Sequence, residues 1–297
     1  MTDHPDWIAV DWGTTHLRVF AMRGTTVIDQ ADSPDGMGTL SRAGFEPALL
    51  RLIGRWLDPR PDARPMRVVA CGMVGARQGW AEAPYRAVPC APVAPGELLI
   101  APTTDPRLRV AIVPGLSQDD PADVMRGEET QLAGLLELQP GFEGCAILPG
   151  THSKHVQIRA GRVTRFHTAM TGELFALLAQ QSVLRHSTAD DTPDPEAFAI
   201  GLDQGRAGQS FHALFALRAE SLLAGLAPSA ARARLSGLLI GAELAGLPDG
   251  PLALIGSGPL VGLYRAALAH LGREVAAHDG GTLARAGLAL AAEGAPA

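Results

Sequence analysis

The chain has 297 residues, of which 46% are hydrophobic and 19% are charged, and its formal net charge at pH 7 is −6. This composition argues against a disordered chain, and the length predicts one large domain or two lobes. The negative charge excludes a broad surface for nucleic acid. The N-terminal residues lack a basic region before an apolar run, and no uncharged apolar stretch approaches about 18 residues, so we expect a cytoplasmic protein without a membrane segment.

The first 33 residues predict a meander of three antiparallel strands. Apolar and polar residues alternate from Trp7 to Asp32 around two turn signals, at Gly13–Thr15 and at Arg23–Thr25. The elements expected after this meander are a helix at Phe45–Leu57, strands at Met66–Cys71 and Arg109–Val113, and a helix at Ala122–Leu138 that Pro140 and Gly141 end.

The second half of the chain repeats this pattern, because a strand, a Gly-Thr turn and a strand follow one another again. Gly150–Thr151 matches Gly13–Thr14 in this register. The sequence predicts an α/β protein of two duplicated lobes, residues 1–141 and 142–297, with the last helix packing back toward the first lobe. The strands expected here are Gly144–Leu148, Lys154–Arg159, Val163–Thr168, Leu252–Ile255 and Arg273–Ala276, and the helices are Gly172–Leu184, Pro195–Gly225, Pro228–Leu247, Leu260–Leu271 and Leu283–Glu293.

The two Gly-Thr turns are candidate phosphate-binding loops. A tight turn between strands exposes successive backbone N–H groups and a hydroxyl, which can hold phosphate oxygens. Each turn alone is explained as well by an ordinary hairpin, but the duplication favours a phosphate clamp. The candidate residues are Gly13, Thr14 and Thr15 in the first turn and Gly150, Thr151, His152 and Ser153 in the second.

Three further features belong to the same hypothesis. Asp11, at the end of the first strand, can hold Mg²⁺ that bridges nucleotide phosphates, or can simply cap a turn. Lys154 is the one lysine beside 24 arginines, and we expect it to contact the phosphates or else to face solvent. Gly256–Ser257–Gly258, between a buried strand and a helix, allows the close approach of a flat ligand.

Single cysteines and histidines do not predict another site. Cys71, Cys90 and Cys145 are far apart and odd in number, so we expect buried reduced thiols. His152 and His155 are three positions apart, and an odd spacing on a strand places them on opposite faces, which argues against a zinc site.

The order of two phosphate loops and a late adenosine motif resembles the superfamily of actin, sugar kinases and heat-shock chaperones. The resemblance implies two actin-like (ribonuclease H-like) lobes with mixed sheets flanked by helices, and a cleft that closes on ATP. The second loop of that superfamily usually carries an Asp, whereas this chain has Leu148 and Pro149 there. The metal contact that the resemblance would imply for the second lobe therefore lacks its usual residue in this chain.

Four longer motifs are similar to the 2-dehydro-3-deoxygalactonokinase family, over residues 7–290. The family implies transfer of the ATP γ-phosphate to the 6-hydroxyl of 2-dehydro-3-deoxy-D-galactonate, a keto-deoxy sugar acid, in galactonate catabolism. The motifs are Asp11–Thr15, Cys71–Trp80, Met125–Leu132 and Pro149–Lys154.

Within these motifs we expect Glu128 to be the catalytic base. It matches a Glu-Glu segment of exopolyphosphatases and stands at the start of the expected helix, while Asp123 and Glu129 are the alternatives. Arg77 is expected to bind the substrate carboxylate as a bidentate fork, although a surface arginine explains it too. The other candidate substrate residues are Gln78, Trp80, Tyr85 and Arg126.

Two other functions stay open from the sequence. A phosphohydrolase of the exopolyphosphatase type would use the same Glu-Glu segment, but the second loop lacks the expected glycine-rich run. A non-enzymatic, ATP-driven binding protein like the chaperones is the other alternative, and we expect it to be less favoured because no separate peptide-binding domain is seen after Glu293. The sequence does not decide between a monomer and a homodimer, or between the galacto and gluco epimers.

Overall fold

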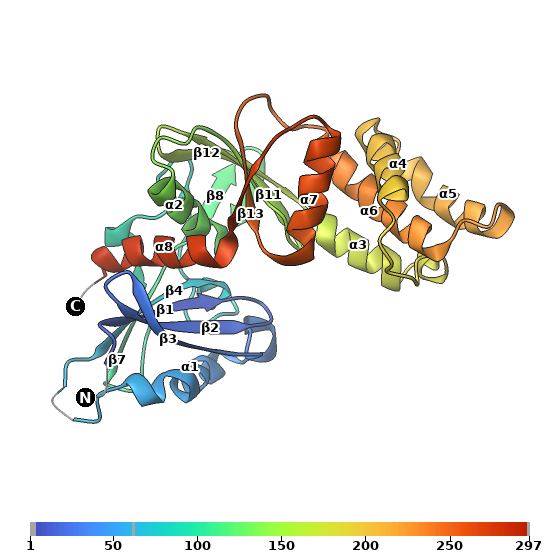
Figure 1. Cartoon of the computed structure of the whole chain (residues 1–297). Coiled ribbons are helices and arrows are strands. Elements are labelled where there is room, and N and C mark those ends of the chain that lie inside the picture. Colours follow the sequence, from blue (N-terminus) through green and yellow to red (C-terminus); the bar gives the residue numbers. More distant parts are fainter. Residues whose placement is uncertain (1–3, 61–62, 296–297) are drawn as a thin grey trace. The chain divides into compact units, whose positions relative to one another are not determined.

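The computed structural model describes residues 4–60 and 63–295. They form two compact units (Figure 1). Unit 1 contains the chain up to Glu143, the segment Ile158–Arg165 and the C-terminal segment from Asp279, and unit 2 contains Gly144–Gln157 and Phe166–His278. None of the helices in the described residues is long and apolar enough to cross a membrane.

Unit 1 is built on a six-stranded mixed sheet in the order β3-β2-β1-β4-β7-β6. The first three strands are antiparallel, and β4 and β7 extend the sheet in parallel from β1. The predicted meander is therefore confirmed. The strands are β1 Trp7–Trp12, β2 Leu17–Arg23, β3 Thr26–Ser33, β4 Met66–Gly72, β6 Leu99–Ile100 and β7 Leu108–Ile112.

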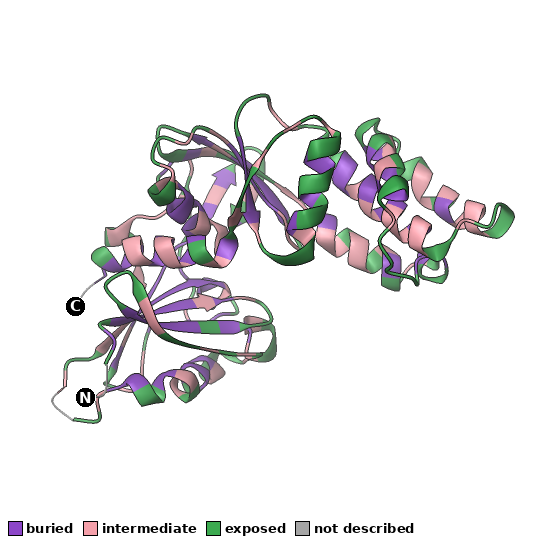
Figure 2. Ribbon diagram, viewed as in Figure 1, coloured by how far each residue is buried: buried purple, intermediate pink, exposed green. Residues whose placement is uncertain are grey.

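Both faces of this sheet are covered, which explains why β1 is apolar at nearly every residue. Ile8 and Val10 pack in a cluster with helix α1 (Phe45–Ile53), whereas Trp7 and Ala9 pack in a cluster with helix α8 (Gly280–Glu293). Alternate side chains of one strand thus stabilise two separate cores, as the period of two requires. Figure 2 shows the central strands as buried.

A small sheet precedes helix α2 (Glu128–Leu138), and it corrects the predicted helix at 122–138. Residues Ala122–Met125 form β9, which pairs antiparallel with β8 (Leu116–Asp119) beside β5 (Arg86–Ala87). The apolar spacing of this segment matched a helix, but the cross-strand pairing satisfies its backbone instead. Gly127 has a φ of 107°, and the helix begins only after it.

The second copy of the sheet lies mostly in unit 2 and has the strand order β12-β11-β10-β13-β14. This matches β3-β2-β1-β4-β7 strand for strand, so the predicted duplication is confirmed. Each Gly-Thr turn joins the first two strands of its copy. The strands are β10 Gly144–Leu148, β11 Ser153–Arg159, β12 Arg162–Ala169, β13 Leu252–Gly256 and β14 Ala276–Asp279.

The helices of unit 2 differ from prediction at one break, and one strand is shifted. The helix expected over 195–225 is two helices, because Gly208 has a φ of 74° and interrupts the backbone. The strand expected at 273–276 lies at β14, since the Arg273 backbone N–H donates to the Leu268 carbonyl at the end of α7 and not to a neighbouring strand. The helices are α3 Thr171–Gln180, α4 Pro195–Arg206, α5 Ser210–Leu223, α6 Pro228–Leu244 and α7 Gly258–His270.

Helices α4 and α6 touch backbone to backbone through glycines spaced four residues apart. A Cβ atom on Gly205 would lie 2.1 Å from the Leu238 carbonyl oxygen, and one on Gly241 would lie 2.2 Å from the Leu202 carbonyl oxygen. The pair can approach this closely only because neither helix carries a side chain there.

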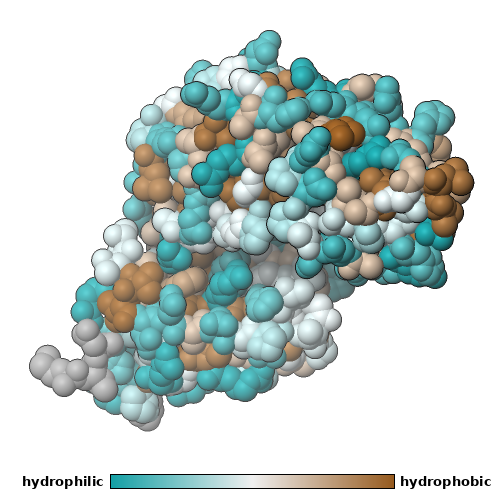
Figure 3. Space-filling model, turned by 45° about the vertical axis from the view of Figure 1, so that its right-hand side comes forward, coloured by the Kyte–Doolittle hydropathy of each residue, from teal (hydrophilic) through white to brown (hydrophobic). Residues whose placement is uncertain are grey.

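The outer face of α5 is apolar, unlike the exposed face of an ordinary surface helix. Phe211 and Leu223 have exposed fractions of 87% and 88%, and Phe215 and Leu222 are also exposed. Brown surface gathers near the right-hand edge of Figure 3, in the region of α4 and α5.

Candidate active site

The ends of β1 and β4 meet the start of α2 at one edge of the sheet in unit 1. Asp11 and Trp12 lie beside Cys71 and Gly72 in the parallel register. A Cβ atom on Gly72 would lie 2.6 Å from the Trp12 carbonyl oxygen, and one on Gly127 would lie 3.3 Å from the Gly72 Cα. Two predicted motifs are thus packed against Asp11 because glycines permit the approach.

Asp11 is a partly buried carboxylate at this edge. Its side chain is 27% exposed, and its Oδ2 lies 3.3 Å from Arg18 Nη1. Burial raises the pKa of Asp11, and the Arg18 guanidinium partly offsets that effect. A carboxylate that water solvates poorly gains from a nearby cation, which fits a metal ligand.

Glu128 and Glu129 fold back over the turn that precedes α2. A carboxylate oxygen of Glu128 accepts from the Arg126 backbone N–H at 3.0 Å, and one of Glu129 accepts from the Gly127 N–H at 2.7 Å. The other Glu129 oxygen accepts from the Thr130 hydroxyl at 2.9 Å. Both acids therefore cap the backbone N–H groups at the start of the helix.

The two acids differ in burial. The side chain of Glu128 is half-buried, whereas Glu129 is fully buried. Burial raises the pKa of Glu129 to about 8, with the Glu128 charge as the second cause. At neutral pH, Glu129 is thus mainly a neutral acid beside a more exposed carboxylate.

Asp123, the alternative base, lies on β9 and not on α2. It faces Gln118 in the register of β8 and β9, and its Oδ1 accepts from the Val124 N–H at 2.8 Å. The structure thus separates Asp123 from the first turn of α2 by the turn at Arg126–Gly127.

The guanidinium of Arg126 is enclosed in unit 1. It lies over the Tyr85 ring with its Cζ 4.3 Å from the ring centroid, and its Nη2 donates to the Ala83 carbonyl at 2.9 Å. Its Nε and Nη1 are buried and have no hydrogen-bond partner in the described part of the chain. Such unpaired buried donors are costly, so they mark a place where an anion would be stabilised.

The other candidate substrate residues occupy different surroundings. The Arg77 side chain is 81% exposed and pairs with Glu82, and Gln78 beside it is exposed as well. Trp80 is a core residue whose indole N–H donates to the Pro102 carbonyl at 3.0 Å. The structure therefore brings Tyr85 and Arg126 together, and places Trp80 in the core.

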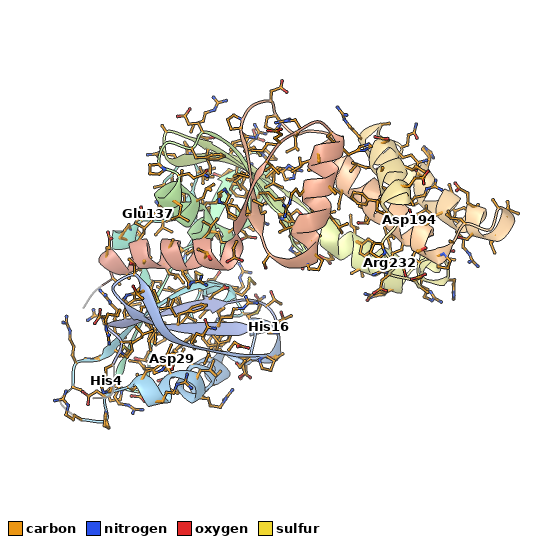
Figure 4. The ribbon with its side chains drawn as sticks, in the orientation of Figure 1. His4, His16, Asp29, Glu137, Asp194 and Arg232 are labelled. Carbon is orange, nitrogen blue, oxygen red and sulfur yellow. The ribbon has the colours of Figure 1, made fainter. Side chains whose placement is uncertain are left out.

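The first Gly-Thr turn packs against a second loop of unit 1. The Gly13 N–H bonds the His16 carbonyl at 2.9 Å, which closes the turn, and Gly38 N–H bonds the Thr14 carbonyl at 2.9 Å. Thr14, Thr15 and His16 are exposed at its tip. His16 is labelled in Figure 4.

The second Gly-Thr turn is held at its base by the side chains of Ser153 and Tyr264. The Gly150 N–H donates to Ser153 Oγ at 3.4 Å, and the Ser153 hydroxyl bonds the Tyr264 hydroxyl at 2.9 Å. Thr151 and His152 remain exposed at the tip, and His152 Nε2 pairs with Glu173 at 2.5 Å. Both predicted loops thus have a fixed base and an exposed tip.

Lys154 is buried, with 5% of its surface exposed. The solvent-facing alternative is therefore wrong. Its contact with nucleotide phosphates stays a prediction. The three cysteines are buried free thiols, as predicted.

A cavity of about 570 Å³ opens in unit 2 beside the second turn. Its walls are mostly apolar, and Gly150 stands at one side while Pro259 and Leu260 stand at another. The parallel strands β10 and β13 end next to each other, which brings the Gly256 turn beside Pro149. Gly150 of the second phosphate loop lines this cavity together with Pro259, the residue after the predicted adenosine motif, whereas Gly256, Ser257 and Gly258 themselves do not line it.

Polar groups enter this cavity at a few points, and the sequence analysis missed them. Arg232 lies over the Phe175 ring at 5.0 Å and donates to the Thr188 carbonyl, while Asp194 caps α4 (Figure 4). Thr171 and Tyr264 line it as well. These residues come from α3, α6, α7 and the N-cap of α4, and no spacing along the chain links them.

No group of three or more His, Cys, Asp or Glu side chains in the described ranges could hold a metal by itself. Mg²⁺ does not need such a cage, since it is usually held by one or two carboxylates and by substrate phosphates. Asp11 fits that mode as a single carboxylate ligand.

Comparisons with known proteins agree with the motifs over the whole chain. The family described as 2-keto-3-deoxy-galactonokinase matches residues 11–291. A Rhizobium meliloti (strain 1021) protein assigned as a 2-dehydro-3-deoxygalactonokinase is 39% identical, over 98% of this chain and 98% of that protein. The 2-dehydro-3-deoxygalactonokinase of Escherichia coli (strain K12) is 35% identical, over 95% of this chain and 96% of its own.

Solved structures agree with the fold. A crystal structure from Sinorhizobium meliloti, assigned as a 2-dehydro-3-deoxygalactonokinase protein, has a TM-score of 0.89 at 39% identity and covers 97% of this chain and 98% of that one. The activator of the 2-hydroxyisocaproyl-CoA dehydratase from Clostridium difficile, with bound ADPNP, has a TM-score of 0.52 at 15% identity over 97% and 95% of the two chains. The latter likeness shows the actin-like fold alone. The chain belongs to the 2-keto-3-deoxy-galactonokinase family.

Proposed function

We propose that this protein transfers the γ-phosphate of ATP to the 6-hydroxyl of 2-dehydro-3-deoxy-D-galactonate, with Mg²⁺. The observation that carries the proposal is membership of the kinase family over residues 11–291, with named relatives that match nearly the full length. The geometry adds a role for each unit.

Unit 2 supplies the nucleotide site in this proposal. The apolar cavity accommodates a flat base, and the exposed tip formed by Thr151 and His152 stands beside it to receive phosphates. In unit 1, Gly13, Thr14 and Thr15 are the matching phosphate donors.

Asp11 would hold Mg²⁺ together with phosphate oxygens. When bound, the ion would supply positive charge to the phosphates. The burial that raises the pKa of Asp11 also strengthens its attraction to a cation.

Unit 1 supplies the groups for the acceptor. The enclosed Arg126 guanidinium would bind the substrate carboxylate, because its two unpaired nitrogens lack an anion among the described residues. Glu128 would accept the proton of the 6-hydroxyl. That oxygen forms the new bond to the γ-phosphorus while the bond from this phosphorus to the bridging oxygen breaks, and ADP leaves.

The test is ADP release with ATP, Mg²⁺ and the keto acid. We expect ADP to form only with the acceptor, and phosphorus NMR to show one phosphomonoester. Two further reactions are measured for comparison, one with the gluco epimer as the acceptor and one with water as the only acceptor. Equal ADP release with and without the keto acid would exclude the kinase and favour a phosphohydrolase.

The comparisons do not favour the phosphohydrolase or the non-enzymatic binding protein. A cytoplasmic location and the association of two copies stay predictions. Light scattering coupled to size-exclusion chromatography decides the second of these.

A further inference from the structure

A buried carboxylate lies beneath the second phosphate loop, where the mechanism above does not use it. Glu243 stands in the last turn of α6, and its side chain is only 1% exposed. It accepts hydrogen bonds from Tyr264 Oη at 2.6 Å, from His155 Nε2 at 2.8 Å and from the Thr171 hydroxyl. Four elements, β11, α3, α6 and α7, therefore meet at one side chain.

The hydroxyl directions in this cluster follow from counting protons. The Tyr264 hydroxyl has one proton, which it donates to Glu243 Oε2. Burial, followed by the Glu243 charge, raises the pKa of Tyr264, which keeps the phenol protonated. Ser153 must then donate to Tyr264, and its oxygen is left to accept from the Gly150 N–H.

The result is a series of hydrogen bonds from the second phosphate loop to the Glu243 carboxylate, all with the same donor-to-acceptor direction. It runs from the Gly150 N–H through Ser153 and Tyr264 to Glu243, and each hydroxyl both donates and accepts. Gly150, Thr171 and Tyr264 also line the cavity. The anchored base leaves only the tip of the loop exposed.

We propose that Glu243 is a positioning residue for the nucleotide phosphates, because it fixes the base of the second phosphate loop through Tyr264, Ser153 and Thr171. The inference rests on the proposed function for the site of the nucleotide. It predicts a selective effect. Loss of these hydrogen bonds should loosen the second phosphate loop. ATP binding should then weaken, whereas the affinity for the keto acid should not change.

Tyr264→Phe is the main test, because it keeps the ring that lines the cavity and removes only the hydroxyl. Glu243→Gln is the second variant, since an amide replaces one acceptor oxygen with a donor. We expect the Kd for ATP, measured by calorimetry with Mg²⁺, to rise about tenfold, the scale of one lost hydrogen bond in a buried network. The KM for the keto acid should change by less than about twofold.

Adenosine separates the loop from the cavity. Because it has no phosphates, its affinity in Tyr264→Phe should stay within about twofold of the parent protein, whereas the ATP affinity falls. Glu220→Gln is the matched control: Glu220 pairs with Arg234 of the same α6, yet neither lines the cavity. It should leave the Kd for ATP unchanged.

Folding is checked by circular dichroism, and Ser153→Ala repeats the test if either variant of Tyr264 or Glu243 is misfolded. An ATP affinity within about twofold of the parent in folded variants would overturn the inference but leave the proposed function intact. Equal losses for ATP and adenosine would overturn it as well. A parent protein that does not bind ATP would overturn the proposed function, and this inference with it.

Discussion

Glu128 stands at the end of a short backbone turn that two adjacent acids cap, and this geometry gives it a defined direction at the start of α2. Its replacement by Gln keeps the size and one acceptor oxygen, so the turn should survive. We expect Glu128→Gln to bind ATP normally and to lose at least about 10²-fold in kcat, the usual scale for a general base.

Asp123→Asn is the comparison for this variant. Because Asp123 lies on β9, its kcat should stay within about threefold of the parent. Near-normal turnover in Glu128→Gln, together with a collapse in Asp123→Asn, would transfer the role to Asp123.

Arg126 and Arg77 are two arginines in the same family motifs with opposite surroundings. Arg126→Met removes the enclosed guanidinium while keeping an apolar stem against Tyr85, and should raise the KM for the keto acid at least about tenfold. Arg77→Met removes an exposed charge and should have a small effect. Steady-state kinetics with both substrates decide, and the reverse ranking would assign the carboxylate to Arg77.

Glu129 should make the stability of the protein depend on pH. Its ordinary pKa is 4.5 and burial raises it to about 8. Between these values the folded state holds a proton that the unfolded chain has lost, so the free energy of unfolding falls as the pH rises from about 5 to about 8. Glu129→Gln cannot ionise, and its stability relative to the parent should therefore increase over this range.

Urea unfolding at several pH values measures the effect. Glu137→Gln, on the exposed face of the same helix, is the control, and its difference from the parent should stay constant (Figure 4). Parallel stability curves for Glu129→Gln and the parent would mean that Glu129 is ionised in the folded protein.

The site in unit 1 was predictable from the sequence where residues follow strands or glycines. Asp11 and Glu128 stand in motifs that carry their own turn signals. Glu243 and Tyr264 could not be found in this way, because they lie in the middle or last turn of apolar helices and become partners only through packing. Arg126 was named among the substrate residues, but its enclosure by Tyr85 needed the structure.

At the scale of elements, the packing of α4 against α6 in unit 2 depends on glycines that carry no side chain at the contact. Gly205→Ala places a methyl group against the Leu238 carbonyl, so α4 and α6 must separate or the backbone must shift. We expect a loss of about 1–3 kcal/mol in the free energy of unfolding, typical of overpacking. Thermal and urea unfolding measure it.

Gly262→Ala is the control for this prediction, since Gly262 also lies inside a helix but a Cβ atom there would meet nothing within 4 Å. Alanine is the better helix former, so stability should be unchanged or higher. An equal loss in both variants would assign the effect to helix backbone and not to the crossing.

Strands were predicted more closely than the ends of helices. The apolar runs of β1, β4, β10 and β13 report burial directly. The predictions of helix at Ala122–Met125 and across Gly208 were wrong for the same reason. In both places the spacing of the apolar residues fits a continuous helix. A glycine with positive φ overrides that spacing, and the sequence does not say which glycines adopt it.

At the scale of the whole molecule, the duplication was predictable because the same Gly-Thr turn follows the same strand twice. The matching strand orders confirm it. The division into units was harder to read. Ile158–Arg165 belongs to unit 1 although it lies between the two segments of unit 2, and the segment from Asp279 belongs to unit 1 although it follows all of unit 2.

Helix α8 supplies Leu288, Ala291 and Ala292 to the core beneath β1 and β4. The ribosome, however, makes that helix only after all of unit 2. At roughly 5–20 residues per second, on the order of ten seconds separate the emergence of Glu143 from that of Asp279, and throughout this interval one face of the nascent sheet lacks its cover. Unit 2 can fold during this interval, but unit 1 cannot be completed until α8 has emerged. The apolar face of the nascent sheet should therefore be a target for chaperones during that time.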